Sequence, residues 1–108
     1  MDQQLQDRLH KWRKQIDVVR KAEELLFNLE ASEKALFGKL FLGFDGKTVQ
    51  ERESKAYSSE VWKEFKRGLA AAKAKHNYEK RMLELKVKAY EAVYLQYKID
   101  NDYLRRPS

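Results

Sequence analysis

The sequence contains no cysteine, one proline and four glycines in 108 residues. Without thiols the chain has neither disulfide bonds nor thiolate chemistry, which is compatible with a reducing compartment. The one proline is Pro107, so no proline interrupts a helix in the rest of the chain. No run of about 18 apolar residues occurs, and residues 1–4 lack the apolar segment of a secretion signal. We therefore expect a cytoplasmic protein that does not span a membrane.

Residues that could form a metal site or a catalytic site are also scarce. The two histidines, His10 and His76, have no second histidine or cysteine at a metal-ligand spacing. Glu79 follows His76 by three residues, but a carboxylate site in a helical bundle needs several inward carboxylates. Positions typical of helix caps or exposed turns hold Ser32, Ser54, Ser58 and Ser59. We expect no catalytic residue, no metal and no cofactor, so the protein is predicted not to be an enzyme.

Charge is abundant and uneven. Charged residues make up 37% of the chain and hydrophobic residues 43%, which favours a helical bundle over a disordered chain. The net charge is +6; residues 58–108 hold 12 Lys or Arg against 7 Asp or Glu, whereas residues 1–57 hold 11 against 10. The positive excess therefore belongs to the second half of the chain. Such an excess attracts acidic proteins or nucleic acid.

The dominant stretch is residues 59–104, which contains a single glycine, Gly68. Its apolar positions recur mostly every three or four residues, the rhythm of one helix face, and residues of high helix propensity lie between them. These positions are Trp62, Phe65, Leu69, Ala72, His76, Leu83, Val87, Tyr90, Tyr94, Tyr97 and Leu104. The pattern predicts one long helix over residues 59–104.

The long helix carries a second apolar stripe after Tyr78, about 120° or more from the first by helix rotation. Its members are Met82, Leu85, Ala89 and Val93. A helix with two apolar stripes needs two neighbours, one from its own chain and one from a second copy. These four residues are therefore self-association candidates, and we expect a homo-oligomer, with a dimer favoured.

The first half of the chain predicts two more helices. A helix over about residues 3–42 follows from the spacing of Leu5, Leu9, Trp12, Ile16, Val19, Leu26, Leu29, Leu36, Phe37 and Leu40. A break near residues 28–33 stays open, because Ser32 suits a new helix start. The glycines at 43 and 46 predict a turn over residues 43–47. Thr48 and Glu51 match a capping box, which predicts a short helix over residues 48–57.

Together these elements predict an all-α protein with a single domain over residues 1–108. Two long helices form an antiparallel hairpin with a short connecting helix, and residues 105–108 form a tail. The hairpin is expected to dimerise into an elongated bundle or a coiled coil.

The remaining face of the long helix is basic. Its candidate contacts for a partner are Lys63, Lys66, Lys73, Lys80, Arg81 and Lys88, with Tyr78 and Tyr103 as aromatic candidates. One hypothesis is a non-enzymatic interaction or assembly module that binds a protein through helix faces. The alternative is an accessory protein that binds single- or double-stranded nucleic acid with little sequence preference.

Residues 46–56, with the sequence GKTVQERESKA, resemble a segment of small helical accessory proteins from bacteriophages and prophages. Those proteins share an amino-terminal helix, a segment similar to G-K-T-x-x-E-R-E and a long charged helix. The resemblance implies an accessory role in DNA recombination or host defence, and it brings no catalytic residue. The Gly46-Lys47-Thr48 sequence is not a phosphate-binding P-loop, because the upstream glycine spacing and the preceding buried strand are absent.

Overall fold

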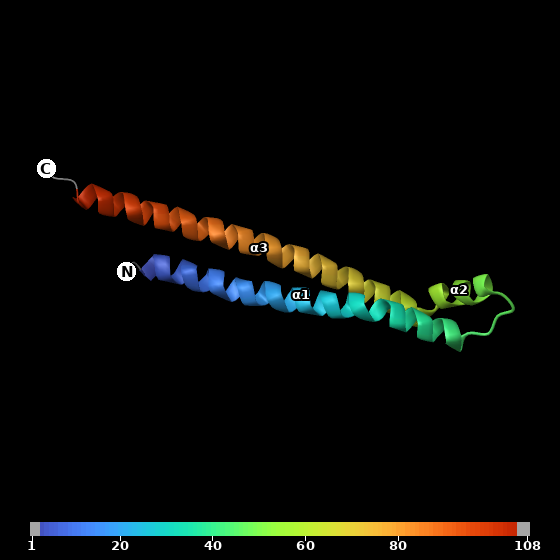
Figure 1. The fold of residues 1–108 in the computed structure, drawn as a ribbon. Coiled ribbons are helices and arrows are strands. Elements are labelled where there is room, and N and C mark those ends of the chain that lie inside the picture. Colours follow the sequence, from blue (N-terminus) through green and yellow to red (C-terminus); the bar gives the residue numbers. More distant parts are fainter. Residues whose placement is uncertain (1–2, 106–108) are drawn as a thin grey trace. The chain divides into compact units, whose positions relative to one another are not determined.

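A computed structural model describes residues 3–105, with side chains described from residue 3 to residue 102. Within residues 3–105 the chain forms three helices and no strand: α1 (Gln3–Gly43), α2 (Val49–Ser58) and α3 (Glu60–Arg105) (Figure 1). The all-α fold class is confirmed. Each helix begins and ends within one residue of the bounds expected from the sequence, and α1 continues through residues 28–33 without a break.

Side-chain caps set where α2 and α3 begin. The backbone N–H of Glu51 donates to Thr48 Oγ1 at 3.1 Å, and the backbone N–H of Trp62 donates to Ser59 Oγ at 3.2 Å. Each cap satisfies an amide that has no partner inside its own helix. The sequence predicted the Thr48 cap and left open which of Ser58 and Ser59 caps the long helix. The structure assigns that role to Ser59.

Two compact units make up the chain. We call residues 3–21 and 77–105 the terminal unit, and residues 22–76 the central unit. In each unit a segment of α1 packs antiparallel to a segment of α3, because higher positions on α1 contact lower positions on α3. In the terminal unit Trp12 contacts Tyr90 and Gln15 contacts Lys86. In the central unit the antiparallel contacts join Glu33 to Lys66 and Phe37 to Trp62.

The core of the central unit is aromatic where α2 meets α1 and α3. The ring of Phe37 lies 4.7 Å from Tyr57 and 5.3 Å from Trp62, and Trp62 lies 5.8 Å from Phe65. Each such pair contributes about 0.5–1.5 kcal/mol beyond the apolar area it buries. Small and aliphatic residues complete this core, namely Ala22, Ala56, Leu69 and Ala72, all at most 7% exposed.

The core of the terminal unit contains a buried amide. Leu5 is 2% exposed and Gln15 only 4%, whereas Ile16, expected on the apolar face, is 46% exposed. The expectation for Ile16 was wrong, because the inward position at this level belongs to Gln15. Further along α3, Tyr94 is 47% exposed and Tyr97 is 36% exposed, so these two rings pack less than their spacing predicted.

No helix within residues 3–105 has a stretch long and apolar enough to cross a membrane.

Candidate functional site

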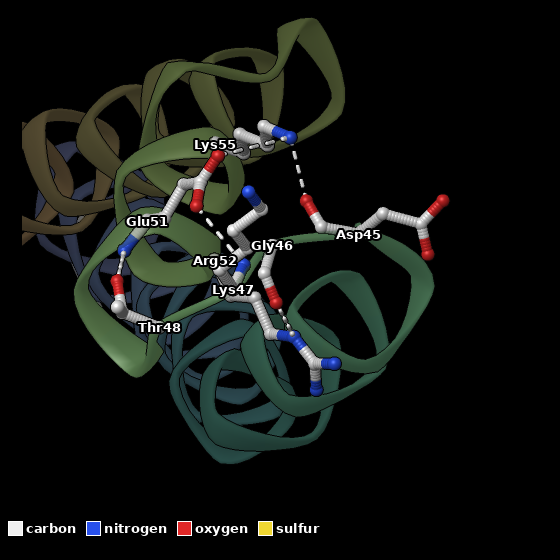
Figure 2. Close-up of polar contacts among 7 residues, drawn as sticks. All are labelled: Asp45, Gly46, Lys47, Thr48, Glu51, Arg52 and Lys55. Atoms are coloured by element: carbon white, nitrogen blue, oxygen red, sulfur yellow. Dashed lines mark hydrogen bonds and ion pairs between the residues drawn. The ribbon is translucent and has the colours of Figure 1, made fainter.

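The segment that carries the phage resemblance uses its polar groups to hold the start of α2 (Figure 2). Beyond the Thr48 cap, the backbone N–H of Lys47 donates to Glu51 Oε2 at 3.0 Å. Glu51 therefore reaches the amide one residue before the one that a standard capping box uses. The side chain of Lys55 donates to the carbonyl oxygen of Asp45 at 2.5 Å. These contacts give the side chains of Thr48, Glu51 and Lys55 a structural role that requires no ligand.

Gly46 is the one glycine whose position excludes a side chain. An added Cβ would lie 2.9 Å from Arg52 Cγ and 3.3 Å from the backbone N of Arg52. The guanidinium Nε of Arg52 in turn donates to the Gly46 carbonyl oxygen at 3.3 Å (Figure 2). The loop is therefore closed against the first turn of α2, and the Thr48 hydroxyl and the Lys47 backbone N–H serve the helix start.

The terminal unit contains an open groove of about 600 Å³ between α1 and α3. Its lining residues are Arg8, Lys11, Lys14, Met82, Leu85, Lys86 and Ala89. We call Met82, Leu85 and Ala89 the groove floor. Leu85 is 59% exposed, which is a large apolar side chain left open to water. Three of the four self-association candidates thus lie together in a groove whose other lining residues are all cationic.

Three cations of α1 line one side of this groove at a spacing of three residues, and we call them the α1 cation row. They are Arg8, Lys11 and Lys14. The row extends about 9 Å along the helix, at 1.5 Å per residue. No hydrogen bond or ion pair joins these three side chains to another residue among those described. Their charge is therefore available to a ligand.

Arg81 and Lys88 flank the other side of the floor, and we call them the α3 cation row. At 100° per residue, Tyr90, which contacts α1, lies about 140° to one side of Leu85. Arg81 and Lys88 lie about 40° and 60° to the other side. Both side chains are exposed. The apolar floor is thus bordered by cations on both sides, and the exposed Glu84 lies about 100° from Leu85, beyond the cations on the α3 side.

The fourth lining cation, Lys86, is held by a part-buried polar network centred on the buried Gln15. Its Nζ donates to Gln15 Oε1 at 2.9 Å. The Nε2 of the same Gln15 donates to Glu79 Oε2 at 2.6 Å and to the Glu79 carbonyl oxygen at 2.9 Å. This network links Lys86 to Glu79 through one amide, so Lys86 is already engaged within the unit.

The other sequence candidates lie outside this groove. Lys80 is exposed about 140° from Leu85 around α3. Val93 lines a separate hollow of about 260 Å³ with Tyr97 and Asp100. Tyr78 is 59% exposed and precedes Met82 by one helical turn, so it lies on the same side of α3, one turn beyond the floor. The side chain of Tyr103 lies outside the described residues.

The remaining lysine candidates belong to the central unit. Lys63 and Lys73 are exposed, whereas Lys66 is engaged locally. Its Nζ lies 2.9 Å from Glu33 Oε1 and 5.6 Å from the centre of the Trp62 ring. Lys66 also lines a hollow of about 720 Å³ beside the aromatic core. The six lysines and arginines proposed as one basic face therefore fall into separate local settings.

Histidine and acidic residues form no evident chemical site. Within the described residues no group of three or more His, Cys, Asp or Glu side chains is placed to hold a metal ion. His76 lies at the edge of the core of the central unit, with its Nε2 3.9 Å from Glu23 Oε2. That nitrogen is buried and has no hydrogen-bond partner among the described residues.

The α1 cation row was missed from the sequence, although a signal for it exists. Residues 3–21 hold six Lys or Arg against two Asp, whereas residues 22–43 hold four Glu against two Lys. Averaging the charge over residues 1–57 concealed this difference. A charge count over single helical segments would have found the basic segment, but not the floor on α3 that it faces.

No protein-family model, curated protein or solved structure matches the chain. The resemblance of residues 46–56 to phage and prophage accessory proteins therefore stays a prediction.

Proposed function

We propose that the protein is a non-enzymatic interaction module that binds an acidic partner protein through the groove of the terminal unit. The observation that carries this proposal is the exposed floor residue Leu85 between the α1 cation row and the α3 cation row. An apolar floor with charged borders is the usual composition of a protein-binding surface, with a desolvated centre and a polar rim. A role as a phage- or prophage-type accessory protein is compatible with such binding.

The charge of the groove favours an acidic partner over a second copy at this face. In a two-fold symmetric dimer the same patch meets itself, so the cations of one copy would face the identical cations of the other. Like charges brought together across an interface cost several kcal/mol, and this cost is what excludes wrong partners. An acidic partner converts the same charges into attraction.

Charge reversal with a matched control tests this function. Lys11→Glu/Lys14→Glu reverses the groove, and Lys63→Glu/Lys73→Glu makes the same change in net charge at exposed positions of the central unit. The probe is a fluorescein-labelled 20-residue peptide of glutamate and serine, followed by anisotropy at low salt. We expect about tenfold weaker binding for the groove variant, since reversing two rim charges changes about 1.4 kcal/mol. Equal loss in both variants, or no binding by the native chain, contradicts the proposal.

A second candidate function is binding of nucleic acid with little sequence preference. Tyr78 favours it, because this ring is 59% exposed and Arg81 follows it by three residues on the same helix. Exposed rings beside cations stack on bases and contact phosphates. A gel shift with single- and double-stranded DNA at low and moderate salt tests it, with Tyr78→Ala as the variant. A salt-sensitive shift that Tyr78→Ala weakens supports this candidate, and no shift at low salt removes it.

Self-association remains a proposal for the part of α3 beyond the groove. Val93 lies in a hollow whose lining residues include one acidic residue, Asp100, and no lysine or arginine, so fewer like charges oppose a second copy there than at the groove. Sedimentation velocity over a range of concentrations tests the dimer, with Val93→Glu as the variant. A dimer that Val93→Glu dissociates supports this interface, and a monomer at all concentrations rules it out.

A further inference from the structure

We infer that the ligand of the groove is an amphipathic α-helix with an apolar stripe and acidic residues on both sides of that stripe. This inference rests on the proposed function and adds the form of the partner to it. It follows from the arrangement of the floor and the two cation rows, which run along the same direction as the helices that carry them.

The groove floor has the length and the apolar character of a surface that binds a helix. Met82, Leu85 and Ala89 lie on one side of α3 and extend over about 10 Å, with Tyr78 one further turn away. The floor is therefore a strip parallel to α3 and shaped by i, i+3 and i+7 spacing. A ligand helix laid along it presents apolar side chains at the same spacing, which is the helix-in-groove mode of recognition.

The two cation rows determine which residues must flank the apolar stripe of the ligand. The α1 row, Arg8 to Lys14, extends about 9 Å, and the α3 row, Arg81 to Lys88, about 10 Å. Both lengths correspond to about two helical turns of a ligand. Since a cation row lies on each side of the floor, carboxylates are required on both flanks of the ligand stripe. A ligand with carboxylates on one flank satisfies only one row.

The apolar floor distinguishes a helix from a nucleic acid. Bases are held by stacking on aromatic rings, whereas the floor itself consists of an aliphatic side chain, a thioether and a methyl group, and the exposed ring of Tyr78 lies one turn beyond it. Burying the exposed part of Leu85 gives an apolar stripe an advantage that phosphates and sugars lack. The groove therefore matches an acidic amphipathic helix more closely than a nucleic-acid strand.

Three labelled peptides of identical composition test this inference by anisotropy. The first carries an apolar stripe at i, i+4, i+7 and i+11 with glutamates on both flanks. The second has all its glutamates on one flank and the far side, and the third is scrambled. We expect the first to bind about tenfold or more tightly than the scrambled peptide, with the second between them. A single-stranded DNA 20-mer is titrated in parallel.

Variants of two leucines on α3 locate the binding. Leu85 and Leu95 are 59% and 58% exposed, but only Leu85 lines the groove. We expect Leu85→Ser to weaken binding of the first peptide, the two-flank peptide, by about tenfold. Leu95→Ser should leave this binding unchanged, because only Leu85 contributes apolar contact from the groove floor. Circular dichroism confirms that both variants keep native helicity.

The outcomes distinguish failure of the helix inference from failure of the proposed function. If the scrambled peptide binds as tightly as the two-flank peptide, the helix inference is wrong and the acidic-partner function stands. If no acidic peptide binds, both are wrong. Groove-dependent binding of DNA that is tighter than that of any peptide overturns the inference in favour of a nucleic-acid ligand. Equal effects of Leu85→Ser and Leu95→Ser overturn it as well, because the peptide then binds elsewhere.

Discussion

The side-chain amide of Gln15 donates to the carboxylate of Glu79 at 2.6 Å, from one helix of the terminal unit to the other. The same amide accepts a hydrogen bond from Lys86, so one buried side chain joins two charged residues on α3. A buried polar group is stable only when its hydrogen bonds are made. Sliding α3 along α1 by one turn would break all three bonds, so this network fixes the register of the two helices.

Replacing Gln15 should therefore destabilise the protein more than replacing an exposed glutamine would. Gln15→Ala removes the side chain that bridges Glu79 and Lys86, and we expect the free energy of unfolding to fall by about 1–3 kcal/mol. Urea denaturation followed by circular dichroism measures the change. The control is Gln6→Ala, an exposed position of the same helix, with an effect within about 0.5 kcal/mol. Equal effects would show that the network contributes nothing to stability.

The core of the central unit should respond to cavity formation at Leu69. This side chain is 2% exposed, whereas Leu42 on α1 is 78% exposed. We expect Leu69→Ala to lower the free energy of unfolding by about 2–5 kcal/mol, because the mutation leaves a cavity as well as removing apolar contact. Leu42→Ala should change it by no more than about 0.5 kcal/mol. Thermal and urea unfolding test the pair, and a small effect of Leu69→Ala would contradict the described packing.

Two glycine-to-alanine substitutions should have opposite signs. Gly46→Ala places a Cβ against Arg52 and should destabilise the start of α2. Gly68 lies inside α3 with nothing within 4 Å of an added Cβ, so Gly68→Ala should stabilise the protein by about 0.5–1 kcal/mol through helix propensity. Unfolding midpoints of the two variants provide the comparison. If both variants are stabilised, the tight approach at Gly46 is wrong.

Loss of the Thr48 cap should loosen α2 before the rest of the protein. Thr48→Ala removes the acceptor of the Glu51 amide, at a cost of about 0.5–2 kcal/mol. Hydrogen exchange of the α2 amides measures this directly, and the Glu51 amide should gain the most in rate. Ser54→Ala, an exposed serine in the middle of α2, serves as the control and should leave exchange nearly unchanged.

Local signals predicted the helices well. Thr48 and Glu51 marked the start of α2, and the spacing of Trp62, Leu69 and Ala72 predicted side chains that the structure buries. Such features depend on residues within two turns of each other, so a single sequence contains them. Such signals failed at residues 15 and 16. The core position that the spacing assigned to Ile16 is occupied by Gln15, because α3 provides hydrogen-bond partners for its amide.

The groove could not be predicted in the same way. Met82, Leu85 and Ala89 were identified as a stripe in need of a neighbour, and that much is a local property of α3. Lys11 and Lys14 lie more than 60 positions earlier in the sequence, and only the pairing of the two helices brings them to the same groove. The choice of an acidic ligand over a second copy depends on that pairing.

The α1 cation row has a consequence for the unliganded protein. Arg8, Lys11 and Lys14 succeed one another by three residues, and neighbouring like charges on a helix destabilise it by about 0.2–0.5 kcal/mol per pair. An anionic ligand removes this repulsion as it binds, so the complex should melt at a higher temperature than the free chain. The same residues that attract a ligand thus lower the intrinsic stability of the helix over residues 8–14 when no ligand is present.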